Sequence, residues 1–239
     1  MNKILKVLVV SIAFAQAAGA YAQQSAGNLV VDLDSKTLSV QAKAEELFER
    51  GDYRRAHVIY LNDLAPIGDK YAQYMLGFMS LSGRGVEQDS VLASAWYRLA
   101  AERGVPQEFV ATRDELLGQL DAVDRTRSDE IYLGLRRDYS DIAISMRETR
   151  EAFDDLSKAV TGSRLGGLSS AVTVVEPWAG STLSADVLIY RLQRRMQGHL
   201  DYITGVLGID RIEAESVSAE KLSDLEERVD VYVRRPDPR

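Results

Sequence analysis

The segment from Leu76 to Gly104 constrains the fold of this chain of 239 residues more than any other part of it. Two apolar stretches with helical spacing flank a short loop that carries Gly83 and Gly85. Glycine adopts positive φ without steric cost, so both residues suit a tight connection between two helices. The segment therefore predicts a helix, a glycine-containing loop and a second helix.

Small and aromatic residues in this segment suit two helices in close contact. Gly77 and Ala93 leave room for the helix axes to approach, because larger side chains push packed helices apart. Trp96 and Tyr97 supply a large apolar area for burial at a low cost in rotamer freedom. We expect these four residues to form the contact between the two helices.

Polar and glycine residues mark the ends of the two helices. The first helix is predicted at 71–81 and the second at 90–103. Asp89 stands at the N-cap of the second helix, where its carboxylate can accept hydrogen bonds from exposed amide groups. Gly104 ends that helix, since a residue with positive φ commonly follows a helix C-terminus.

A second, less complete pair of helices precedes this segment. Its helices are predicted at 39–50 and at 52–64. Gly68, which follows the second of them, lies 36 residues before Gly104. A period of this size is typical of helix–turn–helix arrays, in which each unit buries its apolar face against its neighbours.

Longer helices are predicted after the segment. One is expected at 107–120. Apolar residues three and four positions apart predict an amphipathic helix at 128–160, within which Gly134 is a potential break. Charged residues of alternating sign cover its other face, which is typical of a solvated surface with local ion pairs.

A small α+β region is predicted at the C-terminus, over 171–239. The glycine- and serine-rich segment 161–170 is interpreted as a linker. β-Branched residues predict a strand at 172–175, and apolar periodicity predicts a helix at 183–206. Apolar and polar residues alternate over 229–233, which is typical of a strand with one buried face.

The first residues have the pattern of a secretory signal peptide. Lys3 and Lys6 begin a mostly apolar stretch that reaches residue 18, and small residues ending at Ala22 are typical of a cleavage site. The apolar stretch is shorter than the about 20 residues that span a bilayer. We therefore expect a signal peptide at 1–22, cleavage after Ala22 and no transmembrane segment in the mature chain. Residues 23–38 are predicted to be a disordered lead-in.

The amino-acid composition limits the cellular compartment and the class of partner that we expect. The chain contains no cysteine, so an exported form cannot rely on disulfides, which favours the periplasm over a harsher extracellular setting. Its 36 acidic residues exceed its 29 basic residues, for a net charge of −7. Such a chain repels phosphate backbones, and we expect no nucleic-acid partner.

The motif of the central segment resembles the Sel1-like repeat, a relative of the tetratricopeptide repeat with a longer loop between its helices. The matching residues are Leu76, Gly77, Gly83, Gly85, Asp89, Ala93, Trp96, Tyr97, Ala100, Ala101 and Gly104. Ser80 departs from the pattern, since the family usually carries an aromatic residue there. The resemblance covers 44–104 well and extends weakly through the helices that follow. It implies a mainly α protein with a short α-solenoid over 39–160, which presents a concave surface to a protein or peptide partner.

Residues 171–235 are similar, more faintly, to the second half of an OmpA-like peptidoglycan-binding domain. Leu183, Ser184 and the segment 209–212 fit that family's pattern. Val187 stands where the family has its ligand-binding arginine, which puts binding of the family's ligand in doubt. This resemblance implies a potential contact with peptidoglycan.

Few residues of the chain suit catalysis or metal binding. The two histidines, His57 and His199, lie on different predicted helices, and cysteine catalysis is impossible. We assign no catalytic residue, cofactor or metal ligand. The expected function is a non-enzymatic adaptor in the cell envelope, and the alternative is a protein that binds the cell wall through its C-terminal region. A β-lactamase-like hydrolase, to which some Sel1-like proteins are linked, ranks third because we expect the chain to lack a Ser-x-x-Lys motif.

Overall fold

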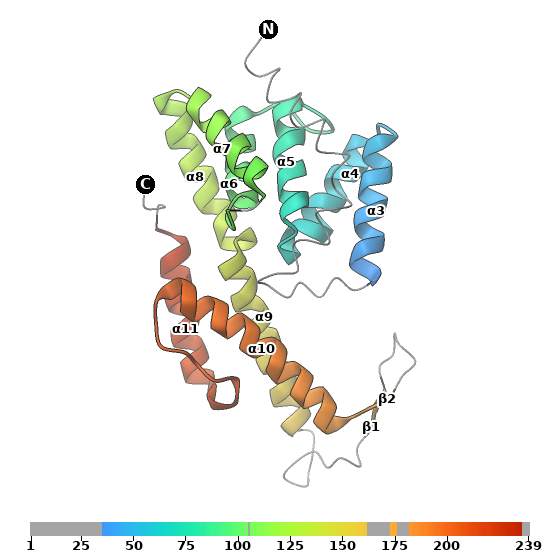
Figure 1. Cartoon of the computed structure of the whole chain (residues 1–239), viewed down its shortest axis with the longest axis vertical. Helices are drawn as coiled ribbons and strands as arrows, with labels where there is room; N and C mark the ends of the chain where they lie inside the picture. Colours follow the sequence, from blue (N-terminus) through green and yellow to red (C-terminus); the bar gives the residue numbers. More distant parts are fainter. Residues whose placement is uncertain (1–34, 105, 162–172, 176–181, 236–239) are drawn as a thin grey trace. The chain divides into compact units, whose positions relative to one another are not determined.

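The computed structural model describes residues 35–104, 106–161, 173–175 and 182–235, and these residues are mainly helical (Figure 1). They divide into two compact units. The first contains the described residues up to Ile144 together with 233–235, and the second contains Ser145–Tyr232. The predicted signal peptide lies outside the described residues, as do most of the lead-in and of the linker, so the predicted segment boundaries stay predictions.

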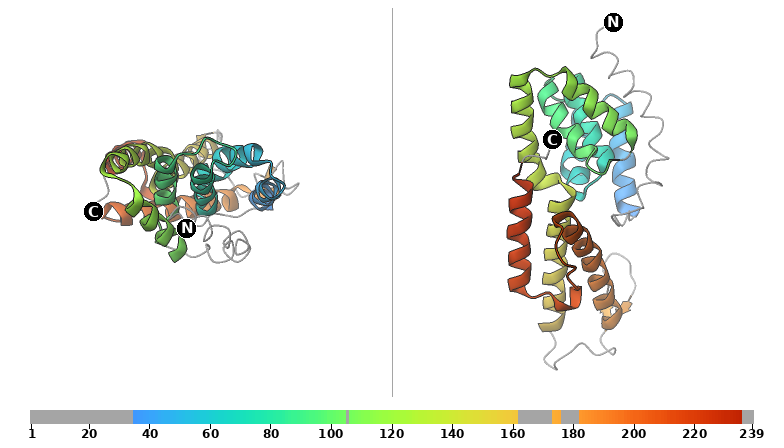
Figure 2. Two further views of the ribbon diagram at one scale, coloured as in Figure 1. Left: turned by 90° about the horizontal axis from the view of Figure 1, so that it is seen from above. Right: turned by 60° about the vertical axis from the view of Figure 1, so that its left-hand side comes forward.

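Among the described residues, the first unit contains six whole α-helices, two short turns of other helix types and the start of a further helix. The whole helices and the turns are α3 (Ser35–Glu49), α4 (Tyr53–Ile59), a π-helical turn (Tyr60–Leu64), a 3₁₀ turn (Ala65–Ile67), α5 (Lys70–Ser82), α6 (Ser90–Ala100), α7 (Gln107–Gln119) and α8 (Ala122–Tyr139). Helix α6 packs against α5, α7 and α8, as two further views show (Figure 2). The first four residues of α3, 35–38, were expected in the disordered lead-in, and that part of the expectation is wrong.

Aspartate caps explain where four of these helices begin. In each case the carboxylate accepts a hydrogen bond from a backbone N–H of the first turn, which would otherwise have no partner. The capping residues are Asp52 before α4, Asp69 before α5, Asp89 before α6 and Asp121 before α8. The N-cap role predicted for Asp89 is thereby confirmed, with Val91 and Leu92 as the donors.

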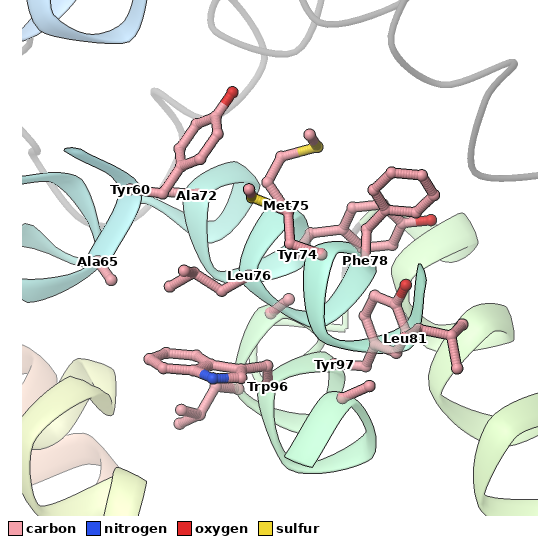
Figure 3. Close-up of a cluster of buried hydrophobic side chains, with 14 of the residues drawn as sticks. Tyr60, Ala65, Ala72, Tyr74, Met75, Leu76, Phe78, Leu81, Trp96 and Tyr97 are labelled. Atoms are coloured by element: carbon pink, nitrogen blue, oxygen red, sulfur yellow. The ribbon is translucent and has the colours of Figure 1, made fainter. Parts of the chain in front are cut away.

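The core of the first unit is rich in aromatic residues and lies around α5 and α6 (Figure 3). The Tyr74 ring stacks on Phe109 of α7 with a centroid distance of 4.4 Å. It also contacts the Tyr97 ring of α6 at 5.0 Å. Three successive helices therefore meet at one aromatic side chain, which gives the unit a continuous core from α5 to α7.

The long helix expected at 128–160 is in fact two helices. Helix α8 ends at Tyr139, and α9 (Asp141–Thr161) begins two residues later. The break is at Ser140, whose backbone is extended, and its Oγ accepts a hydrogen bond from the N–H of Ala143 at 3.3 Å. Gly134, the break suggested by the sequence, lies inside α8. The side chain of Ser140 competes for a backbone donor of the next turn, which favours a new helix start.

The second unit consists of helices and one small hairpin. Its described elements are α9 from Ser145 onward, β1 (Thr173–Val175), β2 (Thr182–Ser184), α10 (Ala185–Leu207), a 3₁₀ turn (Ala214–Ser216) and α11 (Ala219–Val233) as far as Tyr232. The strands are antiparallel, with Val174 opposite Leu183. The strand predicted at 172–175 is confirmed for residues 173–175. A helix was predicted at 183–206, but residues 183 and 184 belong to β2, the strand that pairs with β1.

The α+β prediction for the C-terminal region is wrong at its closing strand. Residues 229–233 form the last turns of α11. Leu225, Val229 and Val233 are buried at helical spacing, whereas Val231 is 45% exposed. Residues 229–233 alternate between apolar and polar, but they also continue a row of apolar residues at helical spacing that begins at Leu222. The longer helical pattern determines the structure. The OmpA-like pattern requires a closing strand at 229–233, and the structure has a helix there.

Side-chain contacts join the three helices of the second unit. Arg150 of α9 pairs with Glu226 of α11, with Nε 2.7 Å from Oε1. Glu148 of α9 pairs with Arg195 of α10. The side chain of Gln197 on α10 holds the segment that leads into α11, because its Oε1 accepts the N–H of Ala214 at 2.7 Å.

Candidate functional site

Helices α5 and α6 are in contact through Gly77. A Cβ atom placed at this residue would lie 2.8 Å from the Tyr97 ring and 3.2 Å from the carbonyl oxygen of Ala93. The Tyr97 side chain is fully buried, so it has little room to move away. The contact explains why small residues occupy positions 77 and 93.

The loop between the two helices is seated against the preceding helix pair. Gly83 and Gly85 have φ of 69° and 78°, the left-handed conformation expected for them. A Cβ atom at Gly85 would lie 2.6 Å from the carbonyl carbon of Tyr53, at the start of α4. Glycine at 85 is thus required by both backbone conformation and space.

Arg84, between the two glycines, adds a contact that the sequence motif did not indicate. Its guanidinium carbon lies 5.2 Å from the ring centroids of Tyr53 and Phe78 and 5.6 Å from that of Phe48. These rings come from the preceding pair and from α5, so the cation–π contacts join one helix pair to the next. The signal in the sequence is an arginine enclosed by two glycines.

The remaining motif residues are packed inside the unit or end a helix. Those in the core are Leu76, Ala93, Trp96, Tyr97, Ala100 and Ala101, all of them buried. The Trp96 ring contacts Tyr139 of α8 with a centroid distance of 5.1 Å. Gly104 has φ of 70° and no atom within 4 Å of a Cβ placed there, so conformation alone requires glycine. The motif residues therefore hold the repeat together.

Ser80, which departs from the family pattern, is buried within α5. Its hydroxyl donates to the carbonyl of Leu76 at 2.8 Å, which satisfies the buried polar atom. Its own carbonyl accepts the N–H of Asp89 at 2.9 Å. The position thus connects the end of α5 to the cap of α6.

A buried group of charges joins α5, the end of α6 and the start of α9. The Lys70 side chain is almost fully buried, and its Nζ lies 2.9 Å from Glu102 Oε2 and 3.1 Å from Asp141 Oδ1. It also donates to the Gln73 side chain at 3.1 Å and to the carbonyl of Leu99 at 3.0 Å. A buried ammonium needs such partners, because an unpaired charge in the interior is costly.

Asp141 is the second centre of this group and is fully buried. Arg103 donates to it from Nε at 2.8 Å and from Nη2 at 3.0 Å. Burial alone would raise the pKa of Asp141, but the charges of Lys70 and Arg103 hold it below its ordinary value. The cations and carboxylates of the group satisfy one another, so its role is to fix the helix ends in place.

The residues considered for catalysis belong to different elements, with His57 on α4 and His199 on α10. Burial lowers the pKa of His57 in the first unit. Burial also lowers the pKa of His199 in the second unit, where the charges of Glu148 and Arg195 act in opposite directions. Ser218 and Lys221 have the Ser-x-x-Lys spacing, contrary to the expectation that the chain lacks it. Ser218 Oγ accepts the N–H of Lys221 at 3.3 Å, whereas the Lys221 ammonium donates to the carbonyl of Ser216 at 3.0 Å. The serine is placed as a helix cap, and the ammonium bonds elsewhere.

The described residues include neither a cluster suited to a metal ion nor a helix suited to a membrane. Within 35–104, 106–161, 173–175 and 182–235, no group of three or more His, Asp or Glu residues could hold a metal ion. No helix in the described part of the chain is long and apolar enough to cross a membrane.

Comparison with known proteins identifies the central helix pair. No curated protein and no solved structure matches the chain. A family model does match part of it, over residues 70–105, which comprise α5, the glycine loop and α6. The resemblance expected from the sequence is confirmed for this segment, whose similarity is to the Sel1 repeat.

Proposed function

We propose that this protein is a non-enzymatic adaptor that binds another protein or a peptide through its helical repeat region. The observation that carries the proposal is the match of residues 70–105 to the Sel1 repeat, a type of unit that mediates contacts between proteins. Helices pack on both sides of this unit, as a stacked array requires.

The burial of the motif residues supports a role in binding a partner more than a role in catalysis. The motif residues and the charged group around Lys70 and Asp141 are all engaged in internal contacts. What the repeat region offers to another molecule is therefore the outer surface of its helices. A short array has a small surface, so specific side chains on it must supply selectivity.

A location in the periplasm is part of the proposal. It rests on the charged, apolar and small-residue pattern of residues 1–22 and on the absence of cysteine. N-terminal sequencing of the protein isolated from a periplasmic extract should begin at Gln23. A protein that retains residue 1, or that stays in the cytoplasm, would contradict this part.

Affinity capture tests the adaptor role. The full chain, immobilised and exposed to a cell-envelope extract, should retain a defined partner. Gly77→Leu should lose that partner, because it disrupts the α5–α6 contact, whereas Gly134→Leu, in open space on α8, should keep it. An extract that yields no partner, together with turnover of a substrate, would contradict the proposal. Peptidoglycan contact is not proposed, because α11 occupies the place of the closing strand on which it rested.

A further inference from the structure

One face of α3 gathers acidic groups next to the start of α5. Gln41, Glu45 and Glu49 are four residues apart and so share a face of α3. The Gln41 side-chain amide donates to the carboxylate of Asp69, the N-cap of α5. Glu45 and Glu49 thereby face the same region as Asp69. We call Glu45, Glu49, Asp69 and the nearby Tyr60 and Tyr71 the acidic surface.

The negative charge of the acidic surface is not neutralised within the described part of the chain. Glu45, Glu49 and Asp69 form no ion pair with any described residue. Burial raises the pKa of Glu45, and the charges of Asp69 and Glu49 raise it further. Burial raises the pKa of Asp69, although its hydrogen bonds and the charge of Arg103 act against that rise. The Arg103 guanidinium is itself paired with Asp141. The fold therefore holds like charges together at a cost in stability.

A buried hydroxyl group provides an independent sign of a ligand. Tyr60 is 1% exposed, and its hydroxyl has no hydrogen-bond partner among the described residues. Its ring meets that of Tyr71 edge to face at 6.5 Å and extends away from Leu76 and Trp96 (Figure 3). A buried polar atom without a partner is costly, and native proteins rarely leave one unless something else supplies the bond.

The hydroxyl of Tyr60 belongs to the same electrostatic environment as the carboxylates. Burial raises the pKa of Tyr60, and Tyr71, Glu45, Asp69 and Glu49 raise it further. The phenol therefore stays neutral, with lone pairs able to accept a hydrogen bond from a donor that the carboxylates attract. The π-helical turn that begins with Tyr60 contacts both α3 and α5, so the acidic groups and the unused acceptor lie in one region of the fold.

We propose that the acidic surface binds a basic side chain of the partner, with arginine favoured over lysine. This inference rests on the adaptor function and adds the chemistry of the partner. A guanidinium carries five N–H donors in a planar fork, enough for carboxylates at Glu45 and Asp69 and for the Tyr60 hydroxyl together. Its flat face can also lie against the partly exposed Tyr71 ring.

A titration with a short peptide tests the site directly. The probe is acetyl-Gly-Arg-Gly-amide, added to the full chain while amide signals are followed by NMR. We expect shifts at residues 41, 45, 69 and 72, a weaker response to the lysine peptide and none to the peptide with citrulline, the neutral analogue of arginine. Equal responses to arginine and citrulline would overturn the proposal, as would binding of calcium ions in place of the peptide.

Substitutions separate recognition from stability. Glu45→Gln should weaken arginine-peptide binding about tenfold, the loss of one charge-assisted hydrogen bond. It should not destabilise the fold, because it removes repulsion from Asp69 and Glu49. Glu46→Gln is the matched control, since Glu46 is exposed on the same helix and pairs only with exposed Arg50. Equal loss of affinity in both variants would overturn the proposal.

Affinity capture then distinguishes this inference from the adaptor function. If the full chain and Glu45→Gln retain the same partner equally well, the adaptor role stands and the acidic surface is not its binding site. If the arginine peptide binds at these residues but envelope extracts yield no partner, the cation site stands and the adaptor role fails. Loss of the captured partner in Glu45→Gln, with retention in Glu46→Gln, supports both.

Discussion

The α5–α6 pair and the helices of the second unit are held together in different ways. In the pair, backbone approaches backbone across Gly77, and a buried group of charges fixes the helix ends. In the second unit, apolar stripes such as Met196 and Leu200 on α10 are joined by ion pairs that are partly open to solvent. Close contacts and buried charges respond steeply to substitution, whereas stripes and solvated pairs respond gradually. We therefore expect substitutions in the α5–α6 pair to cost more stability than substitutions in the second unit.

The largest effect is expected at the buried charges. Asp141→Asn should lower the free energy of unfolding by about 3–5 kcal/mol, because it leaves Lys70 and Arg103 short of a partner. Urea denaturation followed by circular dichroism measures this loss. Asp155→Asn, at an exposed pair with Lys158, should change it by less than about 1 kcal/mol.

The same variant should change the dependence of stability on pH. The pKa of Asp141 is lower in the folded state, so its contribution is complete above the ordinary pKa of aspartate and is lost as pH falls through the lowered folded value. Asp141→Asn should lack this acid-side loss. An unaltered pH profile would show that Asp141 is not held by Lys70 and Arg103.

A smaller but still large effect is expected at the helix contact. Gly77→Leu should cost about 3 kcal/mol, because the new side chain would collide with the buried Tyr97 ring. Gly134→Leu adds the same side chain to a helix in open space and should be neutral or stabilising, since leucine favours helix over glycine. Equal costs in thermal denaturation would contradict the close contact.

A moderate effect should distinguish helix from strand at the end of α11. Val229→Ala should cost about 2 kcal/mol through lost apolar burial, whereas Val231→Ala should be near neutral. In a strand with one buried face, positions 229 and 231 would be equally sensitive. Chemical denaturation of the two variants therefore decides between the two structures.

The smallest effect is expected at the ion pair between α9 and α11. A double-mutant cycle on Arg150 and Glu226 should give a coupling free energy below about 1 kcal/mol, because both side chains are about one-third exposed. The coupling should also shrink as salt is added. A coupling as large as the effect at Asp141 would remove the contrast between the two regions.

Local signals in the sequence determined the central pair well. Gly83, Gly85 and Asp89 each perform a task that one residue type does best, so their structures could be predicted from identity alone. Apolar periodicity alone predicted secondary structure less well, because residues 229–233 fit a strand pattern and a helical pattern at once. The Ser140 break was missed because it depends on a hydrogen bond of one side chain, with no glycine or proline to mark it.

Contacts between distant residues could not be predicted from the chain. Lys70 and Asp141 are 71 positions apart, and each resembles an ordinary surface charge in its local pattern. Likewise, nothing near Tyr60 in the sequence indicates that the charge of Glu45 raises the pKa of its hydroxyl. Such pairings arise from how helices pack, and pattern analysis describes one helix at a time.

The close contact between the glycine loop and the backbone of Tyr53 limits which part of the chain can be duplicated or transferred as a unit. The space denied to a side chain at 85 is occupied by the backbone of the preceding pair, which also supplies two of the three rings around Arg84. A fragment that starts at α5 would lose this contact with Tyr53, whereas a fragment that starts at α3 would keep it. The smallest portable module is therefore two consecutive helix pairs, and a gene duplication that copied α5–α6 alone would require a preceding pair with a backbone of the same shape.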